Sequence, residues 1–549
     1  MDKKILVVIP ARGGSKGIPR KNVRLMAGKP LISYAITCAL NSRFKPTVTI
    51  SSDDEEILTI GEKYGAIRIE RPAYLGEDHV TMDPVIYHAT CYMEEKEKIT
   101  YDYIITMQPT SPMLSVETLD SAIEEAIKGD FDTLLSAVND PHLSWRRENG
   151  KCIPNYKERL NRQYLPEEMR ETGAFFISKR SAVKENTRFG ENVSVFPMPD
   201  HEAGDIDTVE DWVIAEMNLC RKNILIRLEG YPEIGTGHIF RGILLAQNLM
   251  EHNVLFAISE KSKLAMEKIE ASHYKYISIK TNDEVPNIVK ENQIDIVIND
   301  ILDTEEAYIK SLKEAGVRVI NFEDRGPGSF MADATINALY EKPYDDNYDK
   351  KNFYWGSKYY LIREEFIINE PKEFDDELKE VIVSFGGTDP SNLTKKTVSE
   401  LLEASKESKF HTTVVLGLGY DKEGEIRSLI EGYEDKFEII KNVSFMSELM
   451  RKADLAISSQ GRTMLELATM GVPTIILSQN EREKSHAFGN INNGFLNLGL
   501  GSEAKPGTIA KTVVWLSKAT EIRKNMREQM LKKDLRHGIG RVKDLIIGD

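Results

Sequence analysis

The chain contains 549 residues with a mass of 62.3 kDa, more than one hydrophobic core supports, and roughly 150 residues per domain predicts three to four packing units. Apolar residues make up 41% and charged residues 29% of it, a composition that excludes disordered, collagen-like and fibrous proteins. The net charge of −15 argues against a general nucleic-acid-binding protein, because counterion release favours basic surfaces.

The apolar runs of the chain are short. Examples are residues 5–9 and the segment 294–298, which Asp295 interrupts, and both are far below the ~18 residues that a membrane-spanning helix needs. The first run is also too short for the apolar core of a secretory signal. We therefore expect a cytoplasmic protein with no membrane partner. The four cysteines (38, 91, 152 and 220) are scattered without the spacing of a zinc or redox site, and we assign them no role.

The predicted elements of the first part alternate between strands and helices. Residues 5–9 form a buried strand that ends at Pro10 in a glycine-rich turn. Alternation of this kind predicts a mostly parallel sheet covered by helices, which ends with a helix near 208–221. The further apolar runs are 48–50, 103–107, 133–138 and 174–177, and the amphipathic segments between them are 31–42, 54–65, 83–98 and 116–128.

The same strand, loop and helix opening occurs twice more. A strand at 224–228 leads through the turn Gly235-Thr236-Gly237-His238 into a helix at 239–250. A third opening begins at 381–384, after an acidic segment at 364–380 that resembles a linker. The chain is therefore expected to contain three α/β units, at 1–221, 222–370 and 378–549.

The first candidate site is the loop at residues 10–22. The first 50 residues contain ten Lys or Arg and one acid, Asp2, a local charge of +9 that predicts an anionic ligand at this end. Glycine backbone N–H groups approach phosphate closely, and cations neutralise a triphosphate. The loop matches neither the Walker nor the dinucleotide-binding pattern. The residues that suit a nucleotide are Arg12, Gly13, Gly14, Ser15, Lys16, Lys21 and Asn22.

A second candidate segment is Gly204-Asp205-Ile206-Asp207-Thr208. In an extended Asp-x-Asp both carboxylates point to the same face, which suits joint binding of Mg²⁺. The alternative is a strand end at which Asp207 or Thr208 caps the next helix.

Together these segments resemble the CMP-sialic acid synthetases, the acylneuraminate cytidylyltransferases that activate nonulosonic (sialic-acid-like) sugars. The resemblance extends over residues 1–221 and keeps the order of the motifs. Related CMP-Kdo synthetases have a different first loop. The matching segments are 10–22, 28–32, 51–57, 71–72, 108–112, 173–177 and 205–208.

This resemblance implies a Rossmann-like nucleotidyltransferase that transfers CMP from CTP to the anomeric hydroxyl of the sugar and releases pyrophosphate, with Mg²⁺ as cofactor. It implies that Arg12 and Lys21 act on the triphosphate, since positioned cations and metal lower the barrier. Asp205 and Asp207 would carry the metal, with Asp207 also catalytic. A homodimer through this domain is expected. The residues expected to face the sugar are Gln108 and Arg162.

The acceptor side departs from the family pattern at two places. Tyr164 stands where the family commonly has Asp, and Thr172 where it has Asn. The sequence therefore defines the nucleotide chemistry better than the sugar, and it leaves N-acetylneuraminate, legionaminate, pseudaminate and deaminated relatives open.

The candidate residue of the second half is His238, at a glycine-rich turn that opens a helix. Imidazole titrates near neutral pH, so this residue suits a general base toward water; the alternative is a structural or capping histidine. Residues 223–549 resemble the UDP-sugar hydrolase of the pseudaminic acid pathway and its spore-coat polysaccharide relatives, which have a two-lobed GT-B fold. The matching segments are 235–238 with Arg241, 384–390 with 392–394, and Glu466 with 471–473.

By this resemblance His238 activates water against the anomeric carbon of a UDP-linked diacetamido-trideoxyhexose. Glu466 would hold the ribose, and Gly386, Gly387 and Thr388 would approach the diphosphate. An Asp-His/Ser-Tyr motif of that family is replaced around 299–303, without the tyrosine, and its Gly-Gly and Asn-Gln signatures read Gln460-Gly461 and Gln479-Asn480.

The resulting interpretation is a cytoplasmic α/β enzyme with two functions: a Rossmann-like cytidylyltransferase followed by a GT-B-like UDP-sugar hydrolase module. Two alternatives remain for residues 223–549. One is a UDP-sugar-binding or assembly module without catalysis, and the other is a GT-B glycosyltransferase.

Overall fold

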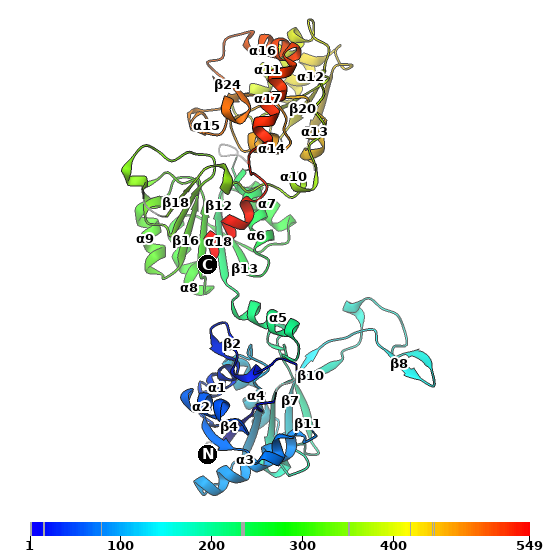
Figure 1. The fold of residues 1–549 in the computed structure, drawn as a ribbon, viewed down its shortest axis with the longest axis vertical. Helices are drawn as coiled ribbons and strands as arrows, with labels where there is room; N and C mark the ends of the chain where they lie inside the picture. Colours follow the sequence, from blue (N-terminus) through cyan, green and yellow to red (C-terminus); the bar gives the residue numbers. More distant parts are fainter. Residues whose placement is uncertain are drawn as a thin grey trace. The chain divides into compact units, whose positions relative to one another are not determined.

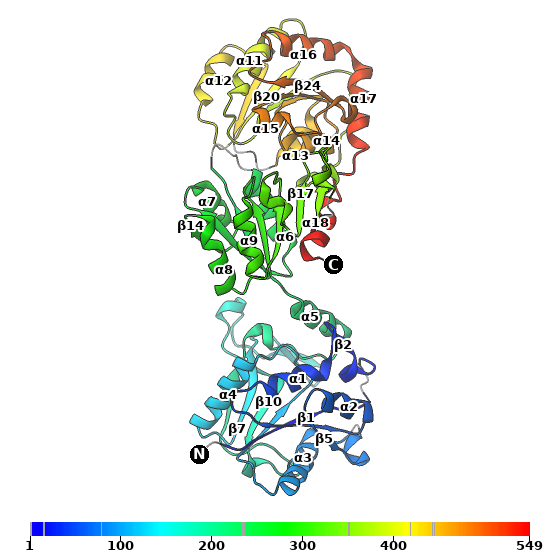
Figure 2. The same cartoon turned by 90° about the vertical axis from the view of Figure 1, so that its left-hand side faces the viewer.

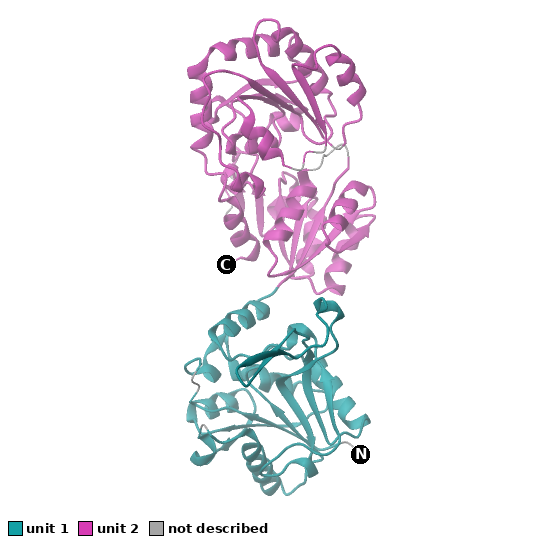
Figure 3. Ribbon diagram, turned by 90° about the vertical axis from the view of Figure 1, so that its right-hand side faces the viewer, with its two compact units in different colours: residues 1–221 teal, residues 222–549 magenta. Residues whose placement is uncertain are grey.

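The computed structural model describes residues 3–14, 17–77, 79–231, 237–349, 352–417, 419–441, 443 and 445–548. The chain forms two compact units, Met1–Arg221 and Lys222–Asp549, coloured separately in Figure 3. Each unit is described by itself.

The first unit is built on a seven-stranded sheet with the order β11-β7-β10-β6-β1-β4-β5. Strand β1 lies between β6 and β4, pairs in parallel with both, and is fully buried. Strand β10 runs antiparallel to β6 and β7, so the sheet is mixed rather than uniformly parallel. The bounds are β1 Ile5–Pro10, β4 Thr47–Ser52, β5 Ile67–Glu70, β6 Tyr103–Met107, β7 Thr133–Asn139, β10 Met169–Lys179 and β11 Val193–Pro197.

Helices cover both faces of this sheet. Alternate residues of β1 pack against α1, α2 and α4 on one face and against α3 on the other. The predicted helix starts have their capping residues: Ser115 caps α4, and Thr208 forms a capping box with Asp211 at α5. The bounds are α1 Leu31–Leu40, α2 Glu55–Lys63, α3 Met82–Glu97, α4 Val116–Lys128 and α5 Val209–Leu219.

A two-stranded hairpin extends away from this sheet (Figure 1). It consists of β8 (Trp145–Glu148) and β9 (Lys151–Pro154), and all four residues of β8 are exposed. The short 3-10 helix Arg162–Tyr164 follows it and leads into β10. The sequence pattern predicts no strand or helix in this segment.

The second unit contains two all-parallel sheets. The first has the order β14-β13-β12-β15-β16-β17-β18, with α6, α7 and α18 on one face and α8 and α9 on the other (Figure 2). The bounds are β12 Asn223–Leu228, β13 Asn253–Ser259, β14 Tyr276–Ile279, β15 Ile296–Asp300, β16 Arg318–Phe322, β17 Ala334–Asn337, β18 Phe353–Trp355, α6 Gly237–Asn248, α7 Lys263–Ala271, α8 Val285–Glu291 and α9 Glu306–Glu314.

The second sheet has the order β21-β20-β19-β22-β23-β24. Helices α11, α12 and α16 share a core with one of its faces, and α13 and α14 with the other. The bounds are β19 Glu380–Ser384, β20 His411–Leu416, β21 Phe437–Lys441, β22 Leu455–Ser458, β23 Thr474–Ser478, β24 Phe495–Leu500, α11 Leu393–Ala404, α12 Glu423–Ile430, α13 Met446–Lys452, α14 Thr463–Thr469, α15 Glu481–Lys484, α16 Thr508–Lys518 and α17 Thr520–Leu531.

The chain exchanges segments between these two lobes. The last helix, α18 (Gly538–Ile547), places Val542 and Ile546 in the core of the first lobe. In the opposite direction, Tyr360 and Phe366 pack in the core of the second lobe. The segment 364–380, expected as a linker, contains α10 (Glu365–Ile368) and the buried Phe366. The two lobes therefore do not coincide with the predicted ranges 222–370 and 378–549, because each lobe contains a segment from the other range.

The fold class predicted from the sequence is confirmed: a Rossmann-like α/β unit is followed by a two-lobed GT-B-like unit. No helix among the residues described above combines the length and apolar character that crossing a membrane requires.

Candidate active sites

The basic, glycine-rich loop connects β1 to the short helix Lys21–Val23. The Asn22 side chain is buried and donates a hydrogen bond to the backbone oxygen of Arg12 at 3.0 Å, which ties the two ends of the loop together. Gly13 N–H lies 3.3 Å from a carboxylate oxygen of Asp53. Gly14 is exposed, and Ser15 and Lys16 lie outside the described residues. The loop thus begins at the carboxyl end of β1, an interior strand of the sheet, and α/β sheets bind ligands at such ends.

The loop reaches the Asp-x-Asp segment through Lys21. Its Nζ donates to the backbone oxygen of Ile206 at 2.6 Å and lies 3.5 Å from a carboxylate oxygen of Asp207. Gly17 is also close, because a Cβ at that position would stand 2.5 Å from the Asp207 carbonyl oxygen. Residues almost 190 positions apart in sequence therefore share one site.

The two aspartates of this segment have different surroundings. Ile206 between them is buried in an apolar cluster, and the Asp207 side chain is 77% exposed. Asp205 Oδ1 is buried and has no hydrogen-bond partner. Burial raises the pKa of Asp205, a hydrogen bond from Thr110 opposes this shift, and the charge of Asp207 adds to it. An unsatisfied carboxylate oxygen beside a second carboxylate fits a hard divalent cation such as Mg²⁺.

Gln108 and Arg162 occupy different parts of the unit. Gln108 follows β6, accepts a hydrogen bond from Thr110 at 3.4 Å, and would be 3.1 Å from a Cβ at Gly173, where φ is +73°. Thr110 also accepts from the Ile206 N–H at 3.0 Å, so Gln108 adjoins the Asp-x-Asp segment. Arg162, beyond the exposed hairpin, contacts Asp140 at 3.3 Å. The described contacts do not bring Arg162 and Gln108 together.

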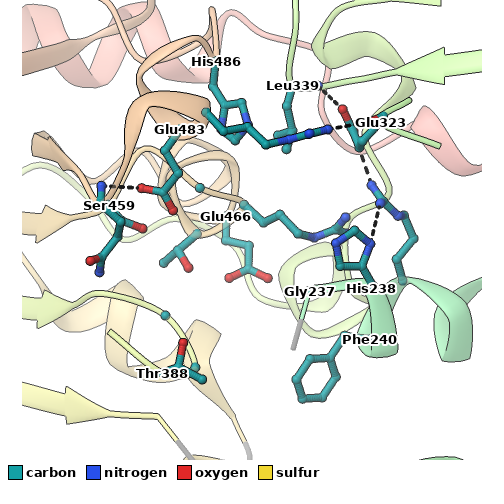
Figure 4. A pocket seen from close by; sticks show the side chains of 18 of the residues that line it. Gly237, His238, Phe240, Glu323, Leu339, Thr388, Ser459, Glu466, Glu483 and His486 are labelled. Atoms are coloured by element: carbon teal, nitrogen blue, oxygen red, sulfur yellow. Dashed lines mark hydrogen bonds and ion pairs between the residues drawn. The ribbon is translucent and has the colours of Figure 1, made fainter. Parts of the chain in front are cut away.

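A cavity of about 370 Å³ in the second unit contains the candidate residues of the second half. His238 at the start of α6 and Glu466 on α14 approach it from opposite lobes (Figure 4). Gly386, Gly387 and Thr388, which follow β19, line it as well. Gly235 and Thr236 of the predicted turn lie outside the described residues.

His238 is held by a buried network of charged side chains. Its Nδ1 contacts Asp300, the last residue of β15, and Arg241 one helical turn further along α6 binds both carboxylate oxygens of Asp300. Arg241 also donates to Glu323 at 3.2 Å. Because Asp300 accepts, Nδ1 carries the proton in the neutral ring, and Nε2 is left with a free lone pair.

The pKa values in this network follow from burial and from the two cations. Burial of Asp300 opposes its ionisation, but Arg241 and His238 outweigh that effect and hold the pKa of Asp300 far below its usual range. Burial raises the pKa of Glu323, and the charge of Arg241 offsets part of this increase. A permanently ionised Asp300 orients His238 and stabilises the imidazolium that proton uptake produces.

Asp300 and Glu323 are functional residues that the sequence patterns did not indicate. Asp300 lies within the segment 299–303 that was noted only for its missing tyrosine. A signal was present: Asp300 ends β15 in parallel register with Leu228 of β12, the strand that precedes His238. The carboxyl ends of adjacent parallel strands meet at one edge of a sheet, so an acid there reaches the neighbouring turn.

Glu466 forms a hydrogen-bonded ion pair with Arg363. Its carboxylate accepts a hydrogen bond from Arg363 Nε at 2.9 Å, and both residues line the cavity. Glu483, also in the lining, accepts from the Gln479 N–H at 2.8 Å, and burial raises its pKa to about 7. The cavity therefore presents both fixed charges and a carboxyl group that titrates near neutrality.

These features define a two-part α/β enzyme that handles nucleotide phosphates. Residues 6–168 match the cytidylyltransferase family, and residues 381–534 match the glycosyltransferase family 28 C-terminal domain. A pseudaminic acid cytidylyltransferase of Campylobacter jejuni subsp. jejuni serotype O:2 is 36% identical over 224 residues, which cover 39% of this chain and 95% of that protein. The chain thus belongs to the cytidylyltransferase family, with a glycosyltransferase-28-like domain in its second unit.

Two further relatives extend the comparison. A Helicobacter pylori protein, pseudaminic acid cytidylyltransferase and UDP-2,4-diacetamido-2,4,6-trideoxy-beta-L-altropyranose hydrolase, is 26% identical over 540 residues, covering 92% of this chain and 93% of that one. The uncharacterized protein MJ1062 of Methanocaldococcus jannaschii is 35% identical over 277 residues, and the match spans 56% of its length. The sequence-based assignment of both halves, a cytidylyltransferase joined to a UDP-sugar-hydrolase-like module, is confirmed, and the chain is an enzyme.

Proposed function

We propose that the first unit transfers CMP from CTP to the anomeric hydroxyl of a nonulosonic acid and releases pyrophosphate. The observation that carries this proposal is the contact of Lys21 with Ile206 and Asp207, because it joins the phosphate-binding loop to the acidic segment. Relatives named as cytidylyltransferases of pseudaminic acid and of N,N'-diacetyllegionaminic acid support the acceptor class.

The proposed roles follow from the charges of these side chains. Arg12 and Lys21 neutralise the triphosphate, and the backbone of Gly13 and Gly14 approaches it closely. Asp205 and Asp207 would hold Mg²⁺, which when bound neutralises charge on the leaving pyrophosphate. Asn22 fixes the loop through the Arg12 carbonyl group, and Gln108 adjoins the acidic segment on the acceptor side.

Asp207→Asn tests the metal role. We expect the variant to lose most of its pyrophosphate release from CTP and a nonulosonate, on the order of 100-fold or more, with an increased Mg²⁺ requirement. Glu210→Gln, an exposed acid on α5 close to the same segment, serves as the matched control. Turnover by the Asp207 variant equal to that of the parent at every Mg²⁺ concentration would contradict the assignment.

For the second unit we propose hydrolysis of a UDP-linked sugar at its anomeric carbon. Asp300 keeps the proton on Nδ1 of His238, and Nε2 accepts a proton from water as the water oxygen attacks. The support is the buried His238–Asp300–Arg241 network at a cavity that both lobes line. The full-length Helicobacter pylori relative is named for both activities.

His238→Ala is the test of this second activity. With a UDP-linked diacetamido-trideoxyhexose the parent should release free sugar and UDP, and the variant should be slower by about 100-fold or more, the usual scale of general-base catalysis. His537→Ala, at an exposed histidine, is the control. Turnover only with an added acceptor would instead identify a glycosyltransferase, and binding without turnover would identify a binding module.

For the acceptor sugar of the first unit we propose pseudaminate, because the Campylobacter jejuni relative of this unit and the Helicobacter pylori relative of the whole chain are both named for pseudaminic acid. Mass spectrometry of CMP-sugar products from a panel with N-acetylneuraminate, legionaminate and pseudaminate tests this. We also propose a homodimer formed through the first unit, to be checked by light scattering, and a cytoplasmic location, where both nucleotide substrates are made.

A further inference from the structure

Four arginines line the cavity of the second unit, and three of them have carboxylate partners. Arg241 binds Asp300 and Glu323, and Arg363 binds Glu466. Arg482 pairs with Asp303. These three cations are therefore neutralised by acids of the chain itself. The four arginines of the lining are Arg241, Arg363, Arg462 and Arg482.

Arg462 differs from the other three. Within the described parts of the chain its guanidinium makes no ion pair; its charged group lies over the ring of Tyr360, 5.2 Å from the centroid. A phenol ring does not neutralise a cation as a carboxylate does. Burial lowers the pKa of Arg462, yet a guanidinium stays protonated at neutral pH. Among the described residues, Arg462 is therefore the lining arginine without an ion pair, although Asp300 and Glu323 are near enough to attract its charge.

The side chain of Arg462 packs against Gly237 of the other lobe. A Cβ on Gly237 would stand 2.8 Å from Cδ of Arg462, so the arginine side chain packs directly against the residue that precedes His238. A side chain at position 237 would displace it. The Arg462 side chain thus lies at the start of α6, and its charge interacts with Asp300 and Arg241, the partners of the proposed general base.

The chemistry proposed for His238 creates negative charge at this place. The water oxygen bonds to the anomeric carbon, its proton moves to Nε2 of His238, and the bond from that carbon to the β-phosphate oxygen breaks with its electron pair going to the phosphate. UDP leaves with one more negative charge than it carried in the substrate. A fixed cation next to that oxygen stabilises the charge as it develops.

We propose that Arg462 binds the β-phosphate of the nucleoside diphosphate and stabilises it as the leaving group. This inference rests on the proposed UDP-sugar activity and assigns a residue that the sequence analysis did not single out. His238 acts on the water that attacks the anomeric carbon, and the β-phosphate is the phosphate bonded to that carbon. A cation near His238 is therefore close to the β-phosphate rather than to the α-phosphate or the uracil.

The experiment compares UDP with UMP, which lacks the β-phosphate, by isothermal titration calorimetry on the full-length chain. The parent should bind UDP more tightly than UMP. We expect Arg462→Gln to weaken UDP by about 10-fold to 100-fold, as for loss of a charge-assisted phosphate contact, while UMP affinity stays within about twofold. Arg462→Lys should retain part of the preference. Arg427→Gln, an exposed arginine on α12, should retain all of it.

The possible results separate this proposal from the proposed function. An equal loss of affinity for UDP and UMP in the Arg462→Gln variant would indicate a structural role and overturn the inference. Unchanged affinity for both nucleotides would also overturn it, even if the KM for the sugar nucleotide were raised. If the parent hydrolyses no UDP-sugar but shows the Arg462-dependent preference for UDP, the inference stands and hydrolysis fails. If the parent does not bind UDP, both are overturned.

Discussion

At the scale of single residues, the protein separates side chains that function by charge from those that must stay neutral. Asp300 is buried but remains ionised, because Arg241 and His238 contact it. His486 in the same cavity has the opposite surroundings. Its Nδ1 donates to the backbone oxygen of Gln460 at 2.6 Å, and burial lowers its pKa to about 4. A buried imidazole without an acid partner is stable only when neutral.

This difference predicts a pH-dependent contribution of His486 to stability. From pH 6.5 down to about 4 the unfolded chain binds a proton at this residue that the folded protein excludes, so stability falls as the pH falls, by at most about 3 kcal/mol. His486→Gln has no ionisable side chain at this position, so this pH-dependent contribution to stability is absent. The difference in melting temperature between parent and variant should therefore shift in favour of the parent as the pH rises from 4.5 to 7.

Glu483 has the opposite effect on stability. Burial raises its pKa to about 7, so its contribution to the free energy of unfolding falls as the pH rises toward 7. It is present in both proteins and largely cancels in the comparison. A parent–variant difference that is independent of pH would show that His486 titrates normally in the folded protein.

At the scale of elements, both sites are made where strands end. The loop after β1 and the segment before α5 meet through Lys21, and the turn before α6 meets the end of β15 through His238 and Asp300. Each site thus combines the carboxyl end of a parallel strand with a residue brought by another element. The glycines permit this approach: Gly17 leaves no room for a side chain against the Asp207 carbonyl group.

Gly17→Ala tests the close approach of the loop. The added Cβ would lie 2.5 Å from the Asp207 carbonyl oxygen, and this backbone atom cannot swing aside, so the loop must shift by about 1 Å. We expect an increase in KM for CTP and a loss of kcat on the order of 10-fold to 100-fold, with UDP-sugar hydrolysis unchanged. Gly14→Ala, with no atom within 4 Å of the added Cβ, should have the smaller effect. Equal effects at the two positions would contradict this reasoning.

At the scale of the whole molecule, the chain consists of two compact units that meet in sequence between Arg221 and Lys222. Each has its own hydrophobic cores and its own candidate site. The two lobes of the second unit, in contrast, exchange α18 and the segment around Tyr360, so they are parts of one folding unit.

Cutting the chain between residues 221 and 222 should therefore preserve both activities, because each unit keeps its complete cores and site. We expect CMP-sugar synthesis by residues 1–221 and UDP-sugar hydrolysis by residues 222–549, each within a few-fold of the full-length rate. A cut near residue 370 should instead abolish hydrolysis. Loss of either activity after the first cut would show that the units depend on each other.

Local sequence patterns predict the alternation of buried strands and helices, the glycine-rich turns, and the cluster of cations near the N-terminus. These patterns reflect periodicity and backbone freedom, which neighbouring residues define. The family motifs added His238, Glu466 and the aspartate pair.

Which distant residues come into contact follows from the three-dimensional packing of the chain. The partnership of His238 with Asp300, the placement of Arg162 beside Asp140, the unpaired charge of Arg462 and the return of α18 to the first lobe depend on strand order and packing over long sequence separations. Strand order and the folding back of a terminal helix leave no local periodic signal, because the free energy that fixes them comes from burying surfaces that belong to different segments.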